Sequence, residues 1–155
     1  MKAEFVNAFL TAFTDVLSKM ASTQAEIGKP FLKKDMCGYG DVSGLIGLSG
    51  ERIKGTLAIT FENQAIMTIT SRMLSETFAE VDDTVTNMAG EIANMVMGSA
   101  KKTLGELGYK FELTIPSIVI GPAHIIAHQH RLPVVTVPIM SDAGRIHVEL
   151  AYEEM

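Results

Sequence analysis

The chain has 155 residues, 47% of them hydrophobic and 20% charged, which is enough apolar material for one sizeable core and argues against disorder. A formal net charge of −5 argues against a general nucleic-acid binder, which needs clustered Lys and Arg. No apolar run is long enough to cross a bilayer, and the N-terminus lacks a signal-peptide pattern. With Cys37 as the only cysteine, we expect a soluble cytoplasmic protein with no intrachain disulfide.

The first half of the chain begins with a predicted helix over residues 3–20, whose apolar side chains recur at helical spacing. A membrane-surface helix would show the same periodicity, but this polar face lacks the run of Lys and Arg that such helices carry. Residues 26–39 are predicted to form an edge strand. Residues 42–49 and 53–61 are predicted to form two further strands joined by a turn.

Two helices are predicted in the middle of the chain. The first is expected to be capped by Asn63 and to continue to about Glu76. The second is expected to be capped by Asp82 or Asp83 and to continue to about Leu107. Further β-rich runs follow at residues 110–120, 129–140 and 145–152, the last two joined by a turn signal at residues 141–144.

The predicted elements repeat in order, so the two halves of the chain resemble each other. Glu4-Phe5-Val6-Asn7 opens the first half and Glu91-Ile92-Ala93-Asn94 the second, a proline follows each at a similar distance, and each half ends in a hairpin. We therefore predict a single α+β domain over residues 1–155. In it, two pseudo-symmetric α-β-β-β halves, roughly 1–76 and 77–155, form one antiparallel sheet with helices packed on it.

The long second-half helix has an unusual polar face. Its predicted buried stripe consists of Val85, Met88, Ile92, Val96, Ser99 and Thr103. Glu91 and Asn94 fall on another side, about 60° apart in projection. Asn87, Gly98 and Gly105 share that side, and Lys102 lies nearby.

Glycine inside a helix costs about 1 kcal/mol relative to alanine, so glycines beside a polar pair are notable. A flat polar face bordered by glycine favours close approach of another protein. The alternative is an ordinary solvated face, in which tertiary packing holds the helix and the glycines are merely tolerated.

The motif Glu91-x-x-Asn94, the surrounding GEIANMVMGSAKKTLGELGYK and the downstream Pro116 resemble the CheC/CheX family of chemotaxis phosphatases. FVNAF at the N-terminus, GKP at 28–30 and GLIGLSG at 44–50 extend the similarity towards the CheX branch over nearly the whole chain. Two departures stand out. The spacing from Asn94 to Pro116 is one residue shorter than in the family pattern, and the first-half copy Glu4-x-x-Asn7 keeps the full spacing to its own proline.

The resemblance implies a phosphatase that hydrolyses the aspartyl phosphate of CheY-like receiver domains. It implies that Asn94 orients the attacking water and that Glu91 pairs with a receiver lysine. It also implies a homodimer without a cofactor of its own, because Mg²⁺ belongs to the receiver. Asn87, Gly98 and Lys102 are expected to contact the partner. Because Glu4 lies near the chain start, where helices fray, Glu4 and Asn7 are interpreted as a vestigial second site.

Two other functions fit the same pattern. A receiver-binding adaptor would keep the docking face without turnover, and a small-molecule sensor would need a concave apolar pocket within one protomer. His124, His128 and His130 lie close in sequence, but their spacing does not suit a β-rich segment and no metal site is predicted. Strand-edge segments bearing Gly40, Gly44 and Gly47 are expected to pair across a dimer axis.

Overall fold

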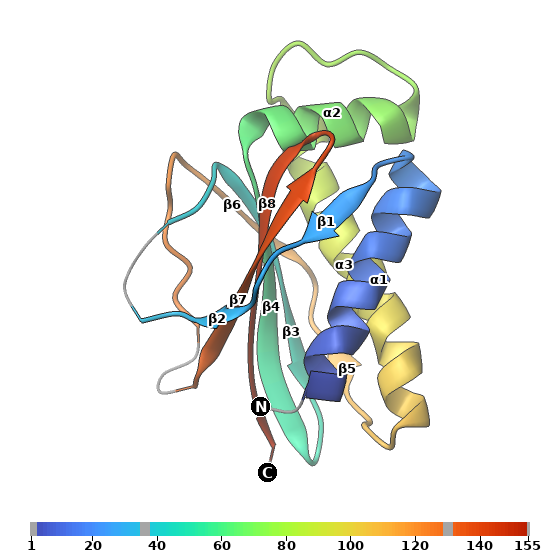
Figure 1. The fold of residues 1–155 in the computed structure, drawn as a ribbon, viewed down its shortest axis with the longest axis vertical. Helices are drawn as coiled ribbons and strands as arrows, with labels where there is room; N and C mark the ends of the chain where they lie inside the picture. The colour runs from blue at the N-terminus through green and yellow to red at the C-terminus, as the bar shows by residue number, and fades with distance from the viewer. Residues whose placement is uncertain (1–2, 35–37, 129–131, 155) are drawn as a thin grey trace.

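The computed structural model describes residues 3–34, 38–128 and 132–154, so Cys37 and His130 lie outside the described residues. The helices are α1 (Ala3–Ala21), α2 (Asn63–Leu74) and α3 (Asp83–Glu106). The strands are β1 (Ala25–Ile27), β2 (Phe31–Leu32), β3 (Val42–Ser49), β4 (Ile53–Phe61), β5 (Glu112–Leu113), β6 (Ser117–Ile120), β7 (Val134–Ser141) and β8 (Gly144–Glu154). Figure 1 shows α1 and α3 on the same side of the sheet, with α2 across one end.

All strands belong to one antiparallel sheet in the order β1-β7-β8-β4-β3-β5, with β2 also paired to β7 and β6 to β3. The order is symmetric about the central β4–β8 pair. The hairpins β3–β4 and β7–β8 meet there, and two short strands flank each hairpin on the outside. The predicted fold class, α+β with one antiparallel sheet, is confirmed, whereas the duplication of residues 1–76 and 77–155 stays a prediction.

The core lies between the sheet and the helices. Alternate residues of β4 and β8, such as Leu57, Ile59 and Val148, are buried and face the helices, as the period-two pattern requires. From α1, Phe5 and Phe13 are fully buried against them. The apolar face of α1 is therefore part of the core, which confirms the core interpretation over the membrane-surface alternative.

Two of the predicted β segments are interrupted. Residues 26–39 form β1 and β2 rather than one strand, and residues 110–120 form β5 and β6. Each break contains a proline, Pro30 or Pro116, which has no N–H to donate to the sheet. The predictions of continuous strands were wrong in this respect.

The caps of the two later helices differ from each other. Glu62, not Asn63, precedes α2, and its side chain makes no capping hydrogen bond. The N–H of Asn63 instead donates to Asp41 Oδ2 at 2.9 Å, so a residue distant in sequence caps this helix. The prediction for α3 is confirmed, because Asp82 Oδ1 accepts a hydrogen bond from the N–H of Val85 at 3.0 Å.

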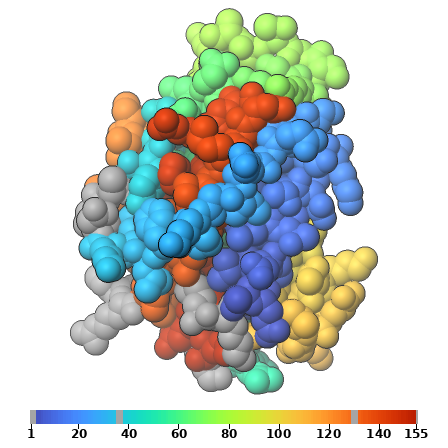
Figure 2. All heavy atoms as spheres, viewed as in Figure 1, coloured from blue at the N-terminus to red at the C-terminus, as the bar shows by residue number. Residues whose placement is uncertain are grey.

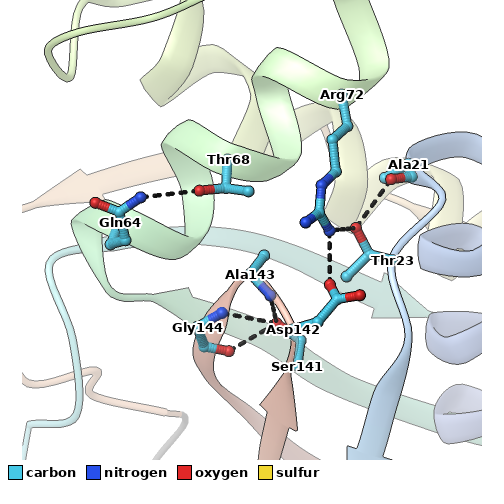
Figure 3. Close-up of polar contacts among 9 residues, drawn as sticks. All are labelled: Ala21, Thr23, Gln64, Thr68, Arg72, Ser141, Asp142, Ala143 and Gly144. Carbon is cyan, nitrogen blue, oxygen red and sulfur yellow. Dashed lines mark hydrogen bonds and ion pairs between the residues drawn. The ribbon is translucent and has the colours of Figure 1, made fainter.

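The end of the molecule that carries α2 is fixed by a polar cluster (Figure 3). Arg72 Nη1 on α2 donates to Asp142 Oδ1 at 2.6 Å and to Thr23 Oγ1 at 2.9 Å. The Arg72 guanidinium holds the pKa of Asp142 below its usual value. One side chain thus connects α2 to the β7–β8 turn and to the segment after α1.

β3 lies inside the sheet, between β4 and the short strands β5 and β6. The expectation that Gly44 and Gly47 lie at a free sheet edge was therefore wrong. Gly40 lies outside β3, and pairing across a dimer axis stays a prediction. Gly44 instead faces α3, where its missing side chain lets the strand and the helix approach closely.

Candidate docking face on helix α3

Helix α3 is held against the sheet by small residues. Ala89, Ala93 and Ala100 are fully buried, and only the backbone of Gly44 fits beneath Ala89. The buried arc is centred near Ala93 rather than Ile92, so the predicted burial of Ser99 and Thr103 was wrong. Both are exposed and line an open groove beside α1. The C-terminal half of α3 is visible next to α1 in Figure 2.

Glu91 and Asn94 lie on the exposed side of α3, within one helical turn of each other. Neither side chain has a hydrogen bond or ion pair with any residue in the described parts of the chain. Asn87, Gly98 and Lys102 are exposed on the same side. A Cβ added at Gly98 would find no atom within 4 Å. The structure thus brings the predicted site residues together on one open face, while their roles in catalysis stay predictions.

The segment between β5 and β6 runs along one side of this face. Near the C-terminal half of α3, Lys101 Nζ lies 3.4 Å from Glu112 Oε2. Near its N-terminal half, Gly90 packs against Pro116 and Ile118, whose nearest carbons would lie about 3.5 Å from a Cβ at Gly90. The segment between β5 and β6 therefore borders the exposed face of α3 along its length.

Glu4 and Asn7 are exposed on α1 but occupy a different setting. With Thr11 and Asp15 they line the groove of about 390 Å³ that α1 forms with α3. Ser99 and Thr103 form the opposite wall. The first-half pair therefore lies in a groove with side chains around it, whereas Glu91 and Asn94 lie on an open helix surface.

The histidines within the described residues interact with other protein groups. His124 Nε2 contacts the hydroxyl of Ser43, and its Nδ1 lies 2.7 Å from the carbonyl oxygen of Gly121. His128 Nε2 lies 3.3 Å from Glu149 Oε1, which also accepts from Lys33 Nζ at 3.0 Å. These interactions lie on the sheet face opposite the helices. Across residues 3–34, 38–128 and 132–154, no group of three metal-ligating side chains converges.

Glu149 is buried in this cluster. Burial acts to raise the pKa of Glu149, but hydrogen bonds from His128 and Lys33 outweigh that effect and leave the pKa below its usual value. Burial lowers the pKa of His147, which stacks on Tyr39 with ring centroids 4.4 Å apart. The cluster holds loops against the face of the sheet opposite the helices. It lies apart from Glu91 and Asn94.

Known proteins place this fold in a defined class. The family model for the chemotaxis phosphatase CheX matches residues 42–140. The structure of a CheC-like superfamily protein from Shewanella sp. PV-4 is 42% identical over 99% of each chain, with a TM-score of 0.93. The chain belongs to the CheX family of chemotaxis phosphatases.

Two further relatives carry functional names. The CheY-P phosphatase CheX of Thermotoga maritima is 25% identical over 122 residues, 78% of each chain. CheX of Borrelia burgdorferi, in a complex described as CheX-CheY-BeF3-Mg²⁺, is 26% identical, with 99% of this chain and 100% of that chain covered and a TM-score of 0.83. In the described part of this chain, no helix is both long and apolar enough to span a membrane.

Proposed function

We propose that this protein hydrolyses the aspartyl phosphate of a CheY-like receiver domain, with Asn94 and Glu91 as the working pair. The observation that carries the proposal is the exposure of these two side chains on one stiff helix, with no partner among the described residues and open space at Gly98. Membership of the CheX family, a relative named CheY-P phosphatase and a relative bound to CheY support the reaction and the partner.

Asn94 positions the attacking water. An aspartyl phosphate is an activated acyl phosphate, and the receiver supplies the Mg²⁺ beside it, so the missing component is a water in line with the scissile P–O bond. Positioning and electrostatics carry most of the rate in phosphoryl transfer. A neutral amide can accept a hydrogen bond from water and donate one to a phosphoryl oxygen. It cannot act as a general base, because it does not take a proton at neutral pH.

Glu91 fixes the register of the docked helix. Its carboxylate has no described ion-pair partner, so it is available for a lysine ammonium of the receiver beside the phosphorylation site. Asn87, Gly98 and Lys102 complete the contact surface, with Gly98 allowing close backbone approach and Lys102 offering a cation to the partner. One rigid helix delivers both functional groups because their spacing matches a single turn.

The protein itself is proposed to need no cofactor and to act in the cytoplasm as a homodimer, bound neither to nucleic acid nor to membrane. The sole metal in the reaction is the Mg²⁺ of the receiver. Glu4 and Asn7 are proposed to be a vestige of duplication, because they line a groove with Thr11 and Asp15 instead of lying on an open helix surface. Sedimentation of the purified protein over a range of concentrations tests the dimer.

Decay of a phosphorylated receiver tests the proposed reaction. A CheY-like receiver from the same genome is charged with a small acyl phosphate, freed of excess donor, and followed by phosphate release with and without this protein. A phosphatase speeds the decay catalytically, at protein concentrations well below that of the receiver. An adaptor binds the phosphorylated receiver and leaves its decay rate unchanged, and that result would overturn the proposal.

A further inference from the structure

The segment that joins β5 to β6 presents Ile115 to solvent. Its exposed fraction of 88% is the highest among the large hydrophobic side chains that the structure describes. A single exposed isoleucine is ordinary on a protein surface. This one, however, occupies a fixed place at the border of the docking face.

Ile115 lies in a β-bulge. The N–H of Thr114 donates to the carbonyl of Gly47 at 2.9 Å, and the N–H of Gly47 donates to Thr114 Oγ1 at 2.7 Å. Ser117 then pairs with Leu45, so Ile115 and the proline after it oppose a single residue of β3. A bulge of this kind redirects a side chain at a sheet edge, often next to a functional site.

The residues on either side of Ile115 are both held in place. On one side Thr114 is bonded to β3, and on the other Pro116 packs against Gly90 of α3. Because the segment runs along α3 from Lys101 back to Gly90, Ile115 lies abreast of the turn that holds Glu91 and Asn94. The backbone of Ile115 is thus fixed beside this turn of α3, and its apolar side chain is exposed to solvent there.

The opposite edge of the sheet has the same kind of bulge, but with a charged residue in place of the apolar one. The pairing of β1 and β2 with β7 slips by one residue between the pairs Ile27–Ile139 and Phe31–Thr136. The position that corresponds to Ile115, directly before the proline, is occupied by the exposed Lys29. The bulge therefore does not require an apolar residue at this position. The apolar side chain of Ile115 needs a different explanation.

We propose that Ile115 is the apolar anchor of the docking surface and packs against an apolar patch of the receiver beside its phosphorylation site. The proposal rests on the phosphatase function proposed above. The α3 face supplies polar groups and glycines but little hydrophobic area, whereas tight interfaces depend on a few buried anchors. Continuity with the Glu91–Asn94 face assigns the receiver, rather than another protein, as the occupant. Rigid presentation by the bulge limits the entropy lost on binding.

Binding of a BeF₃⁻- and Mg²⁺-loaded receiver to the full chain tests the anchor. We expect Ile115→Ala to raise both the Kd and the KM about tenfold, as loss of a buried anchor does. The kcat should remain within about twofold, because the catalytic geometry is intact. Ile115→Val should recover most of the affinity. The matched control, Lys29→Ala at the opposite bulge, should bind as the wild type does.

Two results would overturn the anchor role. In the first, Ile115→Ala binds the receiver as tightly as the wild type while Asn94→Ala has lost turnover, so that the phosphatase proposal stands and the anchor alone fails. In the second, Ile115→Ala changes the sedimented mass but not receiver binding, so that a second copy of this chain covers Ile115. Failure of the phosphatase proposal is recognised separately, by a wild-type protein that binds the phosphorylated receiver but leaves its decay rate unchanged.

Discussion

Gly44 on β3 and Ala89 on α3 are in backbone contact: a Cβ built on Gly44 would lie 2.2 Å from the carbonyl oxygen of Ala89. No real side chain tolerates that separation, and a backbone oxygen cannot rotate away. The contact sets the height of α3 above the sheet two residues before Glu91. The stability of the fold and the position of the docking face thus both depend on this contact between Gly44 and Ala89.

Gly44→Ala should therefore displace α3 and destabilise the protein. We expect a loss of about 1–3 kcal/mol in the free energy of unfolding, typical of overpacking in a tight interior. Urea unfolding followed by circular dichroism measures it. Phosphatase activity of the folded fraction should fall as well, because α3 carries the functional pair. An unchanged midpoint would show that the helix and strand are not held by this contact.

Gly98→Ala should act in the opposite direction on stability. A Cβ there meets nothing within 4 Å, and alanine is favoured over glycine in a helix interior by about 1 kcal/mol. If receivers dock on this face, the same change should raise the KM for the phosphorylated receiver. Gly105→Ala, which is also open but about 10 Å further along the helix than Gly98, is the matched control. Equal kinetics in both variants would argue that Gly98 lies outside the docking surface.

The buried Glu149 should make stability depend on acid pH. Its pKa is lowered in the folded state, so its ionic contribution is full above the unfolded-state pKa near 4.5 and is lost as the pH falls through the folded value. Glu149→Gln removes that contribution and leaves Lys33 buried without its partner, at a cost of about 3–5 kcal/mol at neutral pH. The stability gap between wild type and variant should narrow below pH 4.5. A gap that stays constant down to pH 3 in urea titrations would contradict this assignment.

The first-half pair should be dispensable. We expect the double variant Glu4→Ala with Asn7→Ala to keep the wild-type kcat/KM within about twofold, because the pair lines a groove rather than an open helix face. Adding the same changes to Asn94→Ala tests whether any residual activity comes from α1. A further large drop in that background would show that α1 carries a second working site.

Local patterns predicted much of this structure. The hairpin strands β3 and β4 span the predicted residues 42–49 and 53–61, because both periodicity and turn chemistry are encoded in adjacent residues. The Asp82 cap and the exposed side of α3 were also predictable, since they depend on spacing within one helix.

Features that depend on pairing between distant segments were not predictable. The cap of α2 comes from Asp41, which lies far from Asn63 in the sequence. Exposure of Ser99 and Thr103 follows from how α1 sits beside α3. The bulge at Ile115 exists only through the register of its segment against β3. In each case the local sequence permits several arrangements and the tertiary structure selects one.

The most direct test of the central claim compares Asn94→Ala with Glu91→Ala on one phosphorylated receiver, measuring both Kd and the single-turnover rate of phosphate release. If Asn94 orients the water, Asn94→Ala should lose at least about a hundredfold in rate, as happens when a positioned catalytic group is removed, while its Kd stays near the wild-type value. Glu91→Ala should weaken binding as well as turnover. Equal loss of binding in both variants, or an Asn94→Ala protein with wild-type turnover, would contradict this division of roles.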